Sequence, residues 1–204
     1  MKKVFKWIAL GLVTVVIAFV LLTVIGYFTG FVEIDANGAH SEYAKLSADR
    51  KERVQEAATL DSLKADGNVY RVMPAQVKQY LKGKGKALVY SYIPYCSGSD
   101  CTPAADADRM CAEAGVELVL ISELYYKLFE NTADYPRPVF VINHEAYGTD
   151  DREKYVRMFY NGLVGAENWN RYFNGGLYFC FNRGRYLKQC KKIEEALEFL
   201  QQQR

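Results

Sequence analysis

The sequence predicts an α/β fold, a central mixed sheet with flanking helices, preceded by one transmembrane helix and a helical stalk. Two observations lead to this prediction. From residue 69 onward, short β-branched and aromatic runs alternate with amphipathic segments, a pattern typical of a sheet covered by helices. Residues 7–28 form an unbroken apolar run of 22 residues, which as a helix would cross a hydrocarbon core of about 30 Å.

The composition is that of a folded protein and excludes several functional classes. Half of the 204 residues are hydrophobic, which is too many for a disordered chain. The net charge of +2 argues against a nucleic-acid-binding surface, so no nucleic acid partner is expected. His40 and His144 are isolated from any ligand cluster, and no Gly-rich phosphate loop is present. The sequence therefore predicts no metal and no cofactor.

The N-terminal region, residues 1–30, is predicted to be an uncleaved signal anchor that contacts the membrane through its apolar run. Lys2, Lys3 and Lys6 precede that run, and the positive-inside rule places them in the cytoplasm. We therefore expect a single-pass inner-membrane protein with an extracytoplasmic C-terminal domain. The alternative is a signal peptide whose cleavage would leave a secreted or periplasmic protein, although its apolar region would be unusually long.

Residues 31–68 are predicted to be a helical stalk or linker. The segment after residue 41 is rich in Ala, Glu, Lys and Arg, which favour helices, and Asp66, Gly67 and Asn68 supply a turn at its end.

Residues 69–204 are predicted to form one domain with an inserted segment at 146–176. Pro74 and Gly83 mark the start and stop of its first helix. We expect the aromatic residues of the insert to pack on the sheet edge. The expected strands are 69–72, 88–93, 116–121, 139–142 and 177–181, and the expected helices are 74–82, 103–114, 122–131, 151–160 and 193–200.

The chemically informative segment is residues 92–103, which contains Cys96 and Cys101. It joins the end of an apolar strand to the start of a helix. The N-terminus of a helix carries a positive dipole end that stabilises a thiolate. Two cysteines in this position can alternate between a dithiol and a disulfide.

This order of elements resembles the thioredoxin-like superfamily over about residues 69–202. The aromatic-Cys pair Tyr95-Cys96 ends a strand, and Cys101 stands at a helix start. Pro138 precedes a strand where the family places a proline facing the cysteines. The resemblance implies a membrane-anchored thiol-disulfide oxidoreductase.

In the role that this resemblance implies, Cys96 attacks and Cys101 resolves. Tyr95, Arg137 and Pro138 are expected to line the substrate groove. The expected partners are protein thiols or disulfides as substrates, together with an electron-donor or electron-acceptor redox partner.

The sequence also departs from the family pattern. Its cysteine pair is Cys-x4-Cys rather than Cys-x2-Cys, and Tyr90 occupies the place of the usual buried acid. One alternative is a non-catalytic binding or structural module whose disulfides only staple the fold. A less favoured alternative is a peroxidase similar to atypical peroxiredoxins. Their characteristic threonine is replaced here by Ile93.

The remaining cysteines are expected to be structural. Cys111 falls on the apolar face of a predicted helix and is interpreted as a core residue. In an oxidising compartment, Cys180 and Cys190 are then left to form a structural disulfide. The expected hairpin would separate them too widely unless the chain bends after Leu187.

Overall fold

The computed structural model describes residue 16 and residues 39–96, 98–130, 135, 137–165 and 176–203. The chain divides into two units, residues 1–36 and 37–204, and the fold below is that of the second. The predicted transmembrane run, residues 7–28, lies outside the described residues except for Val16. Among the residues that are described, no helix is both long and apolar enough to span a membrane.

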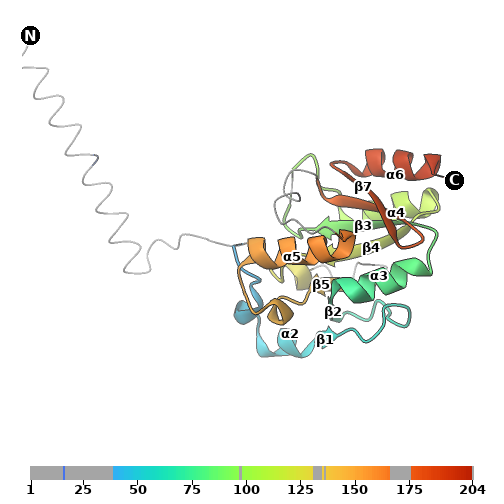
Figure 1. The fold of residues 1–204 in the computed structure, drawn as a ribbon. Coiled ribbons are helices and arrows are strands. Elements are labelled where there is room, and N and C mark those ends of the chain that lie inside the picture. The colour runs from blue at the N-terminus through green and yellow to red at the C-terminus, as the bar shows by residue number, and fades with distance from the viewer. Residues whose placement is uncertain are drawn as a thin grey trace, which may run out of the picture. The chain divides into compact units, whose positions relative to one another are not determined.

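The second unit is built on one seven-stranded mixed sheet, which confirms the predicted α/β class (Figure 1). The strand order is β1-β2-β5-β4-β3-β6-β7. The first five strands in this order are parallel, whereas β6 runs antiparallel to both β3 and β7. The strands are β1 (Val54–Glu56), β2 (Val69–Val72), β3 (Lys86–Tyr92), β4 (Glu117–Ser122), β5 (Val139–Ile142), β6 (Tyr178–Asn182) and β7 (Arg185–Cys190).

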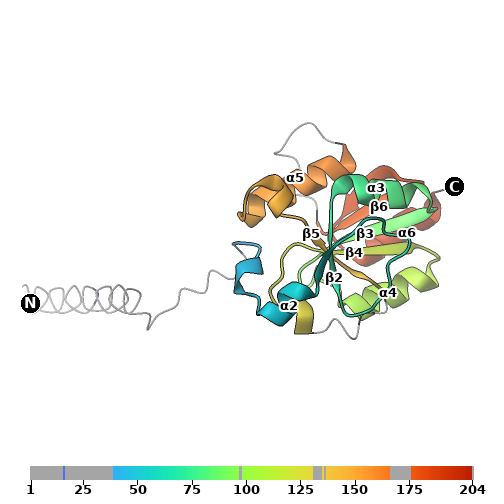
Figure 2. The same cartoon turned by 90° about the horizontal axis from the view of Figure 1, so that it is seen from below.

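Helices cover both faces of this sheet, as Figures 1 and 2 show. On one face, α3 and α5 share a core with alternate strand residues such as Val89 and Ile121. On the other face, α4 and α6 pack on residues such as Leu88 and Leu120. Strands buried on both faces need apolar side chains at every position, which explains their continuous apolar runs. The α-helices are α2 (Ala48–Glu52), α3 (Pro74–Lys82), α4 (Ala104–Glu113), α5 (Arg152–Val164) and α6 (Ile193–Gln202).

The described part of the predicted stalk, residues 39–68, belongs to the domain instead. It forms a short 3-10 helix at Tyr43–Lys45, then α2 and β1. Val54 pairs in register with Val69, and the Tyr43 ring lies 5.1 Å from the Tyr125 ring. The prediction of a helical stalk is wrong here because strand pairing and aromatic packing on the domain outweigh the modest helix propensity of this segment.

One further element prediction is corrected, and the hairpin expected around Arg183 and Gly184 is confirmed. The helix expected over residues 122–131 is replaced by irregular chain and a 3-10 helix at Leu128–Glu130. The Ser122 hydroxyl donates to the main-chain oxygen of Leu124 (2.7 Å), which stabilises a turn instead of a helix. The last expected strand continues into a hairpin, β6-β7, whose turn places Gly184 at φ +74°.

The segment that precedes α2 docks beside a buried histidine, His144. The rings of Tyr43, Tyr125 and Tyr155 lie 5.8–5.9 Å from the His144 ring. Its Nε2 atom is 3.6 Å from the Asp150 carboxylate. Burial lowers the pKa of His144 and outweighs the opposing attraction of the nearby acidic groups.

We predict that this histidine makes the fold sensitive to mild acid. Below a pH of about 6.5, the unfolded chain takes up a proton that folded His144 resists, so the free energy of unfolding falls as the pH falls. Asp150 and Glu145 favour the charged ring, whereas Arg71 and burial oppose it. The slope should reach at most about 1.4 kcal/mol per pH unit and level off below the lowered pKa.

The measurement is urea denaturation between pH 7.5 and about 5. The chain contains only two histidines, and His40 is exposed, so His40→Gln is the matched control. The slope should become smaller in His144→Phe and stay unchanged in His40→Gln, since acidic groups with a lowered pKa, such as Glu195, add a slope of the same sign near pH 5. An equal slope in both variants contradicts the prediction.

Candidate active site

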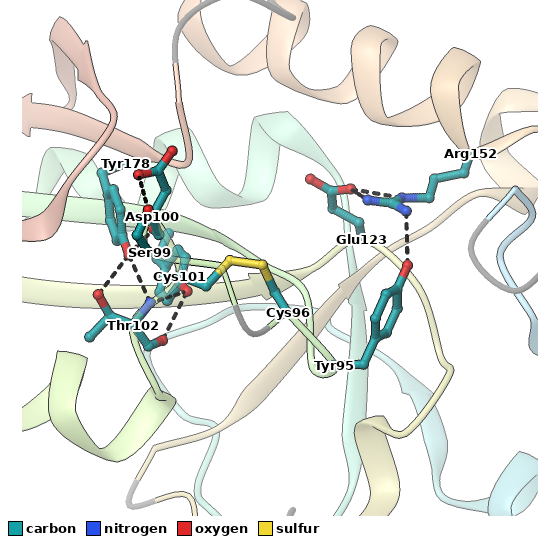
Figure 3. The surroundings of a disulfide bond; sticks show 10 residues. Tyr95, Cys96, Ser99, Asp100, Cys101, Thr102, Glu123, Arg152 and Tyr178 are labelled. Atoms are coloured by element: carbon teal, nitrogen blue, oxygen red, sulfur yellow. Dashed lines mark hydrogen bonds and ion pairs between the residues drawn. A yellow bond between two sulfur atoms is a disulfide. The ribbon is translucent and has the colours of Figure 1, made fainter.

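The Cys96–Cys101 disulfide lies in the loop that follows β3, at the carboxyl edge of the parallel strands (Figure 3). The two Cα atoms are 6.0 Å apart. Two main-chain turns shape the loop, because Cys96 N donates to Ile93 O (3.0 Å) and Cys101 N donates to Gly98 O (3.0 Å). Both cysteines are half-buried, so the disulfide is accessible from solvent.

Helix α4 begins at Ala104, three residues after Cys101. Its ten residues give it a positive dipole end next to the disulfide. This end favours a negative charge nearby and thus the thiolate form of a reduced cysteine. The arrangement predicted from the sequence, a cysteine pair between a buried strand and a helix start, is confirmed.

On the Cys101 side of the loop, two buried tyrosines hold the main chain. Tyr90 and Tyr178 lie opposite each other on β3 and β6, with their rings stacked at 4.6 Å. Tyr90 Oη donates to Thr102 O (2.9 Å), and Thr102 N donates back to it (3.1 Å). Tyr178 Oη donates to Asp100 O (3.0 Å) and shares a hydrogen bond with Thr102 Oγ1 (2.8 Å). Main-chain groups on both sides of Cys101 are therefore fixed to the sheet.

On the Cys96 side, an ion pair holds the preceding residue, as Figure 3 shows. The Arg152 guanidinium donates to Tyr95 Oη (3.3 Å) and to the Glu123 carboxylate, 2.8 Å from its Nε. Ser91 Oγ donates to the same carboxylate (2.5 Å). Burial opposes the charged form of Arg152, but Glu123 more than compensates and raises its pKa. Tyr95 is nonetheless 37% exposed, so this attachment is at the surface.

Two open grooves flank the disulfide, and both cysteines line each of them. The first groove, of about 470 Å³, is formed largely by uncharged residues that include Tyr92, Pro94 and Tyr135. The second, of about 560 Å³, includes Gly176, Leu177 and Lys191. A polypeptide could therefore approach the disulfide from either side.

Arg137 and Pro138 do not share a groove with the cysteines, and this part of the predicted site is wrong. Arg137 Nη1 donates to Glu117 Oε1 (3.0 Å), at the first residue of β4, and Pro138 immediately precedes β5. These strands run parallel to β3, so both residues lie at the amino edge of the sheet. Cys96 lies beyond the carboxyl edge, about 16 Å away along a six-residue strand.

The residues that the sequence reasoning missed come from other elements. Strand β6 lies antiparallel beside β3 and is preceded by Gly176 and Leu177, and Ser91 N donates to Leu177 O (2.8 Å). Glu123 directly follows an apolar strand, a position where a charged residue is a recognisable signal. Arg152 gave no such signal, because only the fold brings α5 to this edge.

Cys180 and Cys190 are free thiols, so the predicted structural disulfide is wrong. In the β6-β7 pair, Cys180 stands opposite Lys188 and Cys190 opposite Tyr178. The two cysteines are therefore diagonal neighbours. Diagonal Cα atoms are typically about 7–8 Å apart, beyond the usual limit of about 6.8 Å for a disulfide.

In the part of the chain that the structure describes, no three His, Cys, Asp or Glu side chains are grouped to hold a metal ion. The chain matches no protein-family model, no curated protein and no solved structure.

We predict that the protein contains one disulfide and three unreactive thiols. Cys111, Cys180 and Cys190 are buried, and burial raises the pKa of each, that of Cys111 to about 12. Alkylation of the folded protein should leave all three unmodified, and alkylation after unfolding without reductant should label all three. Peptide mapping measures this, and a linked Cys180–Cys190 peptide would contradict it. Prior reduction, as the control, should expose all five cysteines.

Proposed function

We propose that the protein is a thiol-disulfide oxidoreductase that uses Cys96 and Cys101. The observation that carries the proposal is the location of one half-buried disulfide at the carboxyl edge of β3, close to the start of α4. The other three cysteines are buried in the core, so this pair is the one that a substrate can reach. The grooves beside it leave room for a polypeptide.

In the reducing direction, the Cys96 thiolate attacks one sulfur of a substrate disulfide. The substrate S–S bond breaks, and its other sulfur leaves as a thiolate. Cys101, as a thiolate, then attacks Cys96 Sγ, closes the Cys96–Cys101 bond and releases the second substrate thiolate. The substrate gains two electrons from the cysteine pair, and the protons lost by Cys96 and Cys101 balance those taken up by the two released thiolates. The reverse sequence oxidises a substrate dithiol.

The proposal includes a thioredoxin-like fold. Support comes from the order of β3, the cysteine loop, α4 and β4, and from the closing strands and helix of the domain. The absence of a proline immediately before β6, where Gly176 and Leu177 stand, is a departure from the expected groove.

We also propose that residues 7–28 anchor the domain in the inner membrane, with residues 41–204 outside the cytoplasm. The support is the uncharged apolar run and the three lysines before it. An oxidising compartment would also allow the Cys96–Cys101 disulfide to persist. Electrons would then pass between substrate proteins and a separate redox partner.

The peroxidase alternative loses support from the fold. The segment that begins with Arg137 and Pro138 is similar to the arginine-containing strand of atypical peroxiredoxins, but Arg137 binds Asp108 and Glu117 at the opposite edge from Cys96. Ile93 offers no hydroxyl to a peroxide.

The chemistry is tested by trapping the mixed disulfide with a defined disulfide-linked peptide. Reduced Cys101→Ser should accumulate one peptide adduct per chain on Cys96, because the resolving thiol is missing, and mass spectrometry identifies the adduct. Reduced Cys96→Ser should react at least about tenfold more slowly, since Cys101 is held against the sheet. Cys111→Ser, a change at a buried thiol, is the control and should turn over like the wild type. If neither variant forms the adduct, the disulfide is a structural staple.

The anchoring proposal is tested with a reporter enzyme that is active only after export, fused after Arg204. The fusion should be active and sediment with the membrane, and the same fusion without residues 1–30 should be inactive. An inactive full-length fusion, or a soluble mature chain that begins near Ala39, contradicts the anchor.

A further inference from the structure

We infer that Tyr90 and Tyr178 are positioning residues that keep Cys101 in place when the disulfide is open. This inference rests on the proposed function and adds to it an assignment of which parts of the loop move. The two sides of the cysteine loop are held differently: buried tyrosines bond to the main chain on the Cys101 side, whereas the Cys96 side is attached through the partly exposed Tyr95.

The tyrosine pair, Tyr90 and Tyr178, is rigidly held. Both residues are at most 1% exposed, and they lie in register on neighbouring central strands. Burial raises the pKa of the Tyr90 hydroxyl, so it remains protonated and can donate at any physiological pH. A hydroxyl buried at this depth needs a partner, and Tyr90 Oη bonds to both main-chain polar groups of Thr102.

The tyrosine pair bonds to the main chain of both residues that flank Cys101 in the sequence, Asp100 and Thr102. Asp100 O accepts from Tyr178, and both main-chain polar groups of Thr102 bond to Tyr90. None of these contacts depends on the disulfide bond itself. The Cys101 main chain therefore stays in the same position after reduction.

On the Cys96 side, no described side chain from the core bonds to the main chain next to the cysteine. Gly98 is exposed, and a Cβ placed on it would meet no atom within 4 Å, so the middle of the loop is unpacked. Tyr95 is attached at the surface, through a 3.3 Å hydrogen bond from Arg152 and an edge-to-face contact with the Tyr126 ring at 5.4 Å. After reduction, Cys96 can move toward a substrate while the main chain of Cys101 keeps its position. A fixed resolving thiol has a high effective concentration toward the mixed disulfide.

The inference is tested with the aromatic disulfide 5,5′-dithiobis(2-nitrobenzoate) and the reduced full-length protein in mild detergent. Attack by Cys96 releases one nitrothiobenzoate anion and leaves a mixed disulfide. Attack by Cys101 on Cys96 Sγ releases the second anion and closes the Cys96–Cys101 bond. Stopped-flow absorbance resolves the two releases, so the resolving step is measured separately from the first attack.

Tyr90→Phe and Tyr178→Phe keep the stacked rings and remove only the hydroxyl groups. Each should slow the second release about tenfold, with the first release unchanged. Tyr70→Phe is the matched control, because Tyr70 is also a buried tyrosine of the sheet but its hydroxyl bonds to the Asp66 carboxylate rather than to the loop. Thr102→Val removes the Thr102 hydroxyl, one of the loop groups that bond to Tyr178, without altering a core ring, and it should also slow the second release, by a smaller factor, if a Phe variant does not fold.

A second release that is as fast in these variants as in the wild type, or equally slowed by Tyr70→Phe, overturns the inference. A wild-type protein that gives the first release but never closes its disulfide contradicts the proposed function itself, and the inference with it. If the wild type closes its Cys96–Cys101 disulfide rapidly, the proposed function is supported. The tyrosine variants then test the positioning role alone.

Discussion

Strand β3 has β4 on one side and β6 on the other, and every side chain from Ala87 to Tyr92 is buried. Its main-chain groups must therefore pair with both neighbours, since water cannot reach them. The chain can emerge only at the carboxyl edge of the strand, after Tyr92. This constraint places the cysteine loop at the surface while the strand below it remains fixed. The position of the candidate site is thus a consequence of how the central strand is buried.

The same burial determines how the loop is held. A polar group that faces the core must find a hydrogen-bond partner or cost about 1–3 kcal/mol. Tyr90 and Tyr178 satisfy this requirement through the main chain around Cys101. The resemblance noted in the sequence would place an acid where Tyr90 stands. Here a neutral hydroxyl, whose role is to hold the loop, occupies that position.

A half-buried arginine, Arg152, connects the loop to the N-terminal part of the domain. Arg152 binds Glu123 and Tyr95 through its side chain, and its main-chain N–H donates to Ala39 O (3.0 Å). Losing one partner of a buried ion pair typically costs about 3–5 kcal/mol, so this contact is well suited to fix α5 at the carboxyl edge. Arg152 therefore contacts both Ala39, in the N-terminal part of the domain, and Tyr95, the residue before Cys96.

The sequence by itself determined the alternation of strands and helices. The runs at 69–72 and 139–142 are strands, because a short apolar, β-branched stretch is typical of a strand that is buried on both faces. It also identified the Cys96–Cys101 pair, since a cysteine pair between a strand and a helix is a local pattern. Only the tertiary structure decided which strands are neighbours. In this strand order, Arg137 and Pro138 lie at the amino edge of the sheet, opposite to the cysteine loop. The residues that do contact the loop are Glu123, Arg152 and Tyr178. The register of β6 and β7 likewise made Cys180 and Cys190 diagonal neighbours. Pairing and register depend on contacts between residues far apart in the chain, which a local pattern does not contain.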